Sequence, residues 1–318
     1  ASFVLNPQKT SQDSCEPSTL SNQAKCVFDT GSSQYGTSVY GMVSIGNWET
    51  LALRPQGSYQ GANPEWTNFW LSEDGTVAND QGVIFIGGGL PHVHHGVVVV
   101  AGPAVAYGQI AVFAYYGAQP SWDHLTVVGL DAHNHSMLSI GLQFGESGYV
   151  IKNANGNSNI VMGLDRGIDD CNHPAPVCNG STYRIDPDVG AGVHHDNVWD
   201  ASPGWAYFYS GGLGFENSAL TPHPAAAYGD LTVNPYLTDT SRTPFTFDQN
   251  ELGGDGTGST LIALASSRWQ LPVGSLNPTQ AALGYLLVGF TPMSGSPVCT
   301  GGYQGTQMGA IPCSPSVN

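Results

Sequence analysis

The sequence predicts an all-β fold of the β-sandwich or jelly-roll type, cross-linked by disulfides and with little or no helix. Short runs of β-branched and aromatic residues are separated by turn residues, and the 318-residue chain contains 42 Gly and 21 Pro. The most apolar stretch, residues 83–118, contains three such runs and no charged residue. Because no helical pattern recurs between the runs, we expect the strands to pack as two sheets.

The predicted strands follow one another along most of the chain. They are expected at 39–45, 50–54, 66–71, 83–86, 97–100, 110–116, 124–130, 136–144 and 205–209. The run Val97–Val100 does not alternate polar and apolar residues, so both of its faces should be covered, by a second sheet or by another subunit. Near the C-terminus, Asn277 and Pro278 indicate a helix that continues through 281–287, and a strand over 285–290 is the alternative.

The turn-rich composition near residues 152–159 indicates a boundary. We predict an N-terminal extended arm over 1–26, a first β lobe over 27–152 and a second β lobe over 153–318, the last with a loop-rich part at 165–205. A single domain is the alternative. Val93-His94-His95 recurs as Val193-His194-His195, which either a duplicated β-module or chance would produce.

The charge balance excludes some classes of partner. Lys and Arg total 8 against 24 Asp and Glu, a formal net charge of −16. Phosphate contacts require clustered cations, so we expect no nucleic-acid partner. No apolar run reaches the ~20 residues that a membrane-spanning helix needs, so we expect no membrane insertion.

The cysteines indicate an oxidising compartment. They form three close pairs, and short local loops are the simplest interpretation, with bridges Cys15–Cys26, Cys171–Cys178 and Cys299–Cys313. Disulfides place the protein outside the cell, secreted or at the cell surface. Asn134 and Asn179 lie in glycosylation acceptor tripeptides, which predicts a glycoprotein.

Histidine pairs are the main candidate for a binding site. His92 with His94, and His133 with His135, have the two-residue spacing that places both side chains on one face of a strand. Four imidazoles could bind a divalent transition metal, zinc or copper. His194, His195 and Asp196 are reserve ligands. The alternative is that these histidines only pack and form hydrogen bonds.

The segment Val27-Phe28-Asp29-Thr30-Gly31-Ser32-Ser33 resembles the catalytic loop of pepsin-like aspartic proteases. This resemblance implies that Asp29 shares a proton with a second aspartate and activates water. The nearest second loop begins at Asp255, which has Gly on both sides where that family has a hydrophobic residue and Thr or Ser. A polar turn is the alternative, and Asp29 is the one catalytic candidate.

These features predict an extracellular structural protein that self-associates through neutral β-rich faces, as a filament, surface-layer or capsid subunit with a histidine metal site. Only 10% of its residues are charged, so large neutral faces are available for contact between copies. Its partners would be copies of itself. The alternative is a secreted hydrolase that depends on a metal ion or acts in acid.

Overall fold

The fold is sheet-rich, with minimal helix in the part of the chain described by this computed structural model. That part comprises residues 2–5, 28–29, 38–45, 51–53, 63–73, 82–101, 109–114, 118, 120–132, 139–144, 155–169, 195–201, 207–209, 213–215, 229–240 and 286–315.

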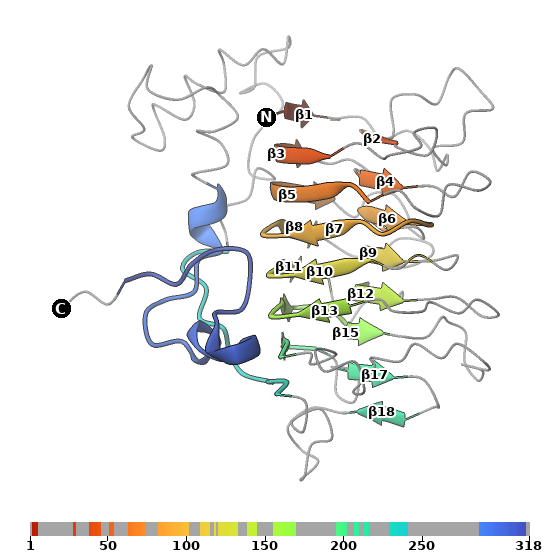
Figure 1. Cartoon of the computed structure of the whole chain (residues 1–318). Helices are drawn as coiled ribbons and strands as arrows, with labels where there is room; N and C mark the ends of the chain where they lie inside the picture. The colour runs from red at the N-terminus through yellow and green to blue at the C-terminus, as the bar shows by residue number, and fades with distance from the viewer. Residues whose placement is uncertain are drawn as a thin grey trace, which may run out of the picture.

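Two stacks of strands form two sheets (Figure 1). The ten-stranded first sheet contains β1 (Ser2–Leu5), β3 (Val39–Ile45), β5 (Glu65–Glu73), β7 (His92–His94), β8 (Val97–Ala101), β10 (Ser121–Asp123), β11 (Thr126–Leu130), β13 (Asn155–Asn157), β14 (Ile160–Met162) and β16 (Asn197–Trp199). The eight-stranded second sheet contains β2 (Phe28–Asp29), β4 (Leu51–Leu53), β6 (Ile84–Ile86), β9 (Gln109–Ala114), β12 (Ser139–Phe144), β15 (Arg166–Asp169), β17 (Tyr207–Tyr209) and β18 (Leu213–Phe215).

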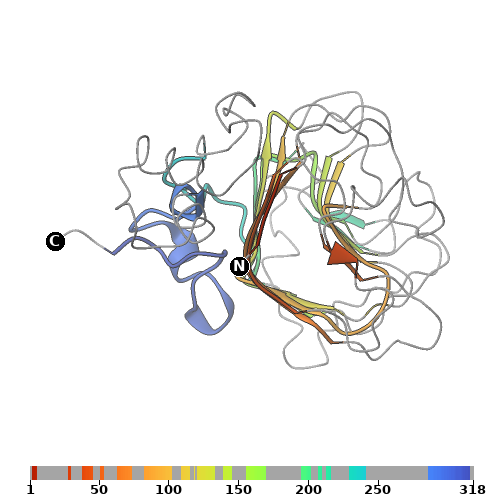
Figure 2. The same ribbon diagram turned by 90° about the horizontal axis from the view of Figure 1, so that it is seen from above.

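The prediction of a β-sandwich or jelly roll is wrong, because the strands pair in parallel. The chain passes from β5 to β6, on to β7 and β8, then to β9. It therefore winds as a helix of strands, and each full turn, which we call a coil, adds strands to both sheets. The order β4-β6-β9-β12-β15 in the second sheet follows the sequence, and among the described strands of this sheet only β17 and β18 pair antiparallel. Viewed along the stack, the coils overlie one another (Figure 2). Parallel strands need long connections, and here the other sheet supplies them in place of helices.

One residue with a positive φ bends the first-sheet part of five successive coils at the same place. Asn68, His95, His124, Ser158 and His195 have φ of 56°, 51°, 53°, 59° and 40°. They form a column, which we call the corner column, because neighbouring strands pair in register on either side of it. Asn and His adopt this left-handed conformation more readily than most other residues.

A C-terminal segment, residues 286–315, lies against the outside of the first sheet (Figure 2). Gly309 N donates to Ser158 O at 2.7 Å, and Ala310 N donates to Thr126 Oγ1 at 2.9 Å. Residues 286–289 are helical, so the helix and not the strand over 285–290 is correct there. Two short 3₁₀ helices follow, η4 (Pro297–Cys299) and η5 (Tyr303–Gly305).

This cover explains the run of four valines in β8. All four are fully buried, so the expectation that both faces are covered is confirmed. Val98 and Val100 belong to the apolar core between the two sheets. Val97 and Val99 pack against the C-terminal segment through Leu286. The covering surface therefore comes from the same chain.

The disulfide Cys299–Cys313 closes a loop in the C-terminal segment and confirms one predicted bridge. The other two pairs, Cys15 with Cys26 and Cys171 with Cys178, lie outside the described residues, as do the acceptor residues Asn134 and Asn179.

Strands on both sides of residue 152 belong to the same sheets, since β12 pairs directly with β15. The division into an arm over 1–26 and lobes over 27–152 and 153–318 stays a prediction about folding units. In the described ranges, no helix is long and apolar enough to cross a membrane.

Buried polar side chains join the later coils next to the corner column. Asn159 Oδ1 accepts a hydrogen bond from Leu125 N at 2.8 Å, and Asp196 Oδ1 accepts from Asn159 N at 2.8 Å. Asp230 Oδ1 in turn accepts from Asp196 N at 2.9 Å. Burial raises the pKa of Asp196 well above its usual range, and the negative charge of Asp230 raises it further. Asn159, Asp196 and Asp230 are buried, so the role of Asp196 is to hold neighbouring coils together through these hydrogen bonds.

We expect Asp196→Asn to stabilise the protein at neutral pH, by about 1 kcal/mol or more, because it keeps an acceptor oxygen for Asn159 and removes a buried charge. The raised pKa means that the folded parent binds the Asp196 proton more tightly than the unfolded chain does. The parent therefore regains stability as the pH falls toward ~3.9, the ordinary Asp value, and the advantage of the variant shrinks. Urea unfolding over this pH range measures the effect.

The matched control is Asp131→Asn, because Asp131 is exposed and also has a positive φ. At neutral pH it should change the free energy of unfolding by less than Asp196→Asn does, because substitutions of exposed residues usually change it by no more than about 0.5 kcal/mol. An Asp196→Asn variant that is less stable than the parent at neutral pH would contradict the prediction and show that the second carboxylate oxygen is required.

Candidate metal centre

The site lies on the outer face of three neighbouring strands, β5, β7 and β10. Trp66, Val93 and Trp122 are paired across these strands, point into the core and are at most 1% exposed. Because side chains alternate along a strand, the flanking residues point outward. This puts His92 and His94 on the surface of β7, each half-buried.

Glycines next to the site leave room for aromatic rings that fix the strands. A Cβ on Gly96, directly after His95, would lie 2.1 Å from the ring of Phe69. A Cβ on Gly156 would lie 2.4 Å from Trp122 Nε1. Contacts this short are impossible without movement, so the two aromatic rings hold the backbone of the site from inside.

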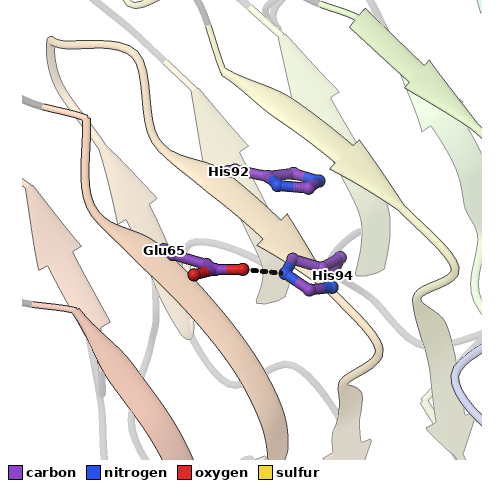
Figure 3. A group of neighbouring side chains, drawn as sticks. All are labelled: Glu65, His92 and His94. Carbon is purple, nitrogen blue, oxygen red and sulfur yellow. Dashed lines mark hydrogen bonds and ion pairs between the residues drawn. The ribbon is translucent and has the colours of Figure 1, made fainter.

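The first group of ligand atoms comes from Glu65, His92 and His94 (Figure 3). One ligand atom from each residue lies within 4.8 Å of the others. Glu65 is paired with His92 in the β5–β7 register, and its Oε1 lies 3.0 Å from His94 Nε2. The rings of His92 and His94 are stacked with centroids 4.2 Å apart.

Neighbouring hydroxyl groups orient these ligands. Tyr40 donates its hydroxyl proton to Glu65 Oε2 at 2.6 Å, and this hydrogen bond, with a further one from His94, lowers the pKa of Glu65. The same bond raises the pKa of Tyr40. Thr67 Oγ1 lies 3.3 Å from His94 Nδ1, so the ring nitrogen that does not face Glu65 also has a polar neighbour. Such partners fix the tautomer and orientation of metal-binding imidazoles.

A second group adjoins the first and contains His95, Asp123 and His124. Asp123 Oδ2 lies 3.0 Å from His124 Nδ1, and the rings of His95 and His124 stack at 4.8 Å with an angle of 8°. Burial lowers the pKa of His95, and the nearby His124 and His94 lower it further. For Asp123, burial raises the pKa, but its bonds with His124 and His92 outweigh this and lower the pKa overall.

Neutral imidazoles and an ionised carboxylate are the forms that bind metal ions. Two imidazoles and one carboxylate form a ligand set that zinc uses in catalytic sites, where a fourth position stays open. Bonds of ~2.0–2.1 Å in a tetrahedral site would put ligand atoms roughly 3.3 Å apart. The 3.0 Å between His94 Nε2 and Glu65 Oε1 is close to this, and the ligand atom of His92 lies within 4.8 Å of both residues' ligand atoms.

The structure brings two of the four predicted ligands together, His92 and His94. His133, His135 and His194 lie outside the described residues. His195 is in the corner column, separated from His124 by Ser158, and its ring contacts Tyr303 at 5.6 Å. Asp196 is buried inside and does not join the group. Asp29 lies in β2, but its side chain is outside the described part, so its proposed role stays a prediction.

Four site residues were not chosen from the sequence: Glu65, His95, Asp123 and His124. The signal that could have found them is the repeated pattern Glu65-Trp66-Thr67-Asn68 and Ser121-Trp122-Asp123-His124, in which Trp marks the inward position. Aligning His92-Val93-His94-His95 between them reproduces the observed register.

No protein-family model, curated protein or solved structure matches the chain. The function is therefore inferred from the geometry of the site alone.

We expect Tyr40→Phe to raise the pKa of Glu65, because the hydroxyl hydrogen bond is the largest cause of its lowering. NMR titration of the side-chain carboxyl carbon measures this in the metal-free protein. Tyr236→Phe is the matched control, since Tyr236 is also exposed but lies in a different part of the fold. An unchanged Glu65 titration in Tyr40→Phe would show that the hydrogen bond does not form in solution.

Proposed function

We propose that this protein binds a divalent transition-metal ion, zinc or copper, on the outer face of its first sheet, with Glu65, His92 and His94 as ligands. The observation that carries the proposal is the convergence of these three side chains, from two coils, with ligand atoms within 4.8 Å. The tyrosine and threonine contacts to Glu65 and His94 support it, because they orient the ligands from outside the set.

The chemistry that this ligand set favours is metal-dependent hydrolysis. Three protein ligands leave a coordination position for water, and a zinc ion lowers the pKa of bound water to ~7. The side chains of His92 and Glu65 are 44% and 42% exposed, so a substrate in solution can reach the ion. The disulfide Cys299–Cys313 supports an extracellular setting for this activity.

His94→Ala should weaken zinc binding by more than ~100-fold, since even residues that only orient ligands contribute 10–100-fold. Isothermal titration of the chelator-treated protein with Zn²⁺ measures the affinity. Binding by the parent should weaken as the solution is made acidic, because protons compete with the metal ion for the imidazoles.

The control is His195→Asn, because Asn keeps the positive φ of this position and His195 is not in the group. This variant should bind Zn²⁺ like the parent. The proposal fails if the parent binds no ion at neutral pH, or if His94→Ala binds as tightly as the parent.

A second candidate function is structural self-association, and the end of the first sheet favours it. Strand β1 pairs with β3 only, so within the described ranges its other edge is open. An open parallel edge can accept a strand from another chain. Copies joined at this edge would build a filament or a surface layer, and the neutral composition predicts that this chain is the subunit of such an assembly.

Light scattering tests this candidate directly. An assembling parent should form particles much heavier than one 33.3 kDa chain. Val4→Pro in β1 should reduce the particle mass, because proline removes a backbone donor from the strand, whereas Val4→Ala should leave the mass unchanged. A parent that stays a single chain at every concentration excludes the candidate.

A further inference from the structure

One carboxylate connects the two groups of metal ligands. Asp123 Oδ1 lies 2.6 Å from His92 Nε2 in the first group. Asp123 Oδ2 lies 3.0 Å from His124 Nδ1 in the second group. The two oxygens of a single side chain thus face histidines that belong to different groups.

A second contact joins the groups through their imidazoles. His94 Nδ1 lies 2.8 Å from His95 Nδ1, and these rings meet edge to face with centroids 5.1 Å apart. The five residues His92, His94, His95, Asp123 and His124 therefore form one continuous cluster.

We propose that this cluster holds two divalent transition-metal ions, bridged by the carboxylate of Asp123. Glu65, His92 and His94 hold the first ion, and His95 and His124 hold the second. This proposal rests on the proposed function, because it adds a second ion next to the first. Ions that share ligands in this way lie ~3.5–4 Å apart in known two-metal sites, where they can bind both the attacking and the leaving oxygen of a hydrolysed substrate.

The corner column supplies the second pair of imidazoles. Neighbouring strands are spaced ~4.8 Å apart, and the rings of His95 and His124 are separated by 4.8 Å. Above and below them in the column lie Asn68 and Ser158, which offer no imidazole. The second site is therefore restricted to these two coils.

Titration of the chelator-treated full-length protein with Cu²⁺ tests the proposal. We expect two bound ions per chain by elemental analysis after gel filtration. Bridged Cu²⁺ ions couple magnetically, so the paramagnetic resonance signal at two equivalents should integrate to fewer than two spins and show a half-field transition. At one equivalent it should integrate to one spin.

The double variant His95→Asn, His124→Asn removes both imidazoles and keeps residues that accept the positive φ of the corner. It should bind one ion with an uncoupled signal. His195→Asn is the matched control from the same column and should bind two coupled ions. Circular dichroism checks that the double variant folds. The spin-coupling measurement is made on the parent protein, so it tests the proposal even if the variant does not fold.

The outcomes separate this proposal from the proposed function. No bound ion in the parent overturns both. One bound ion overturns the two-ion site and leaves the proposed function standing. Two ions with fully additive, uncoupled spins overturn the bridge by Asp123, and two ions in the double variant overturn the assignment of His95 and His124.

Discussion

The rest of the structure depends on the in-register parallel pairing of successive coils. Each residue of the first sheet lies beside its counterpart in the next coil, at the ~4.8 Å spacing of hydrogen-bonded strands. The register turns features that are far apart in the sequence into columns. Trp66, Val93 and Trp122 form an inward column, and Glu65 and His92 belong to an outward one. A slip of one residue in any coil would exchange the two faces, so the apolar core and the polar site are set by the same register.

The corner column adds a conformational constraint to this register. Successive coils carry a residue with a positive φ at this place, and three of the five that are not glycine are histidines. This backbone requirement brings His95 and His124 into parallel stacking beside His94. The histidine cluster therefore arises where an outward strand column meets the corner column. The buried column of Asn159 and Asp196 follows the same path on the inner side and joins later coils through side-chain hydrogen bonds.

The outer face of the first sheet is divided into two chemically different parts. Next to β8 and β11 it is apolar, and the C-terminal segment covers it with Leu286 and Phe290. Next to β7 and β10 it carries the histidines and Asp123, which stay partly exposed. The apolar part contributes to the stability of the fold through burial. The polar part stays partly exposed, so the packing that stabilises the fold and the proposed metal site lie on different sides of the corner.

The sequence by itself determined where nine of the eighteen described strands lie, that helix is minimal and that Val97–Val100 is covered on both faces, and it predicted the bridge between Cys299 and Cys313. These depend on local composition and spacing. Only the tertiary structure decided that the strands pair in parallel, because a short apolar run is compatible with either direction. It also decided the partners of His92 and His94, since Glu65 and Asp123 reach them from other coils through a register that no local pattern specifies. The recurrence of Val93-His94-His95 at 193–195 shows the difference. The sequence could not distinguish this recurrence from chance. The fold places His95 and His195 in one column, because both residues bend a coil at the same point.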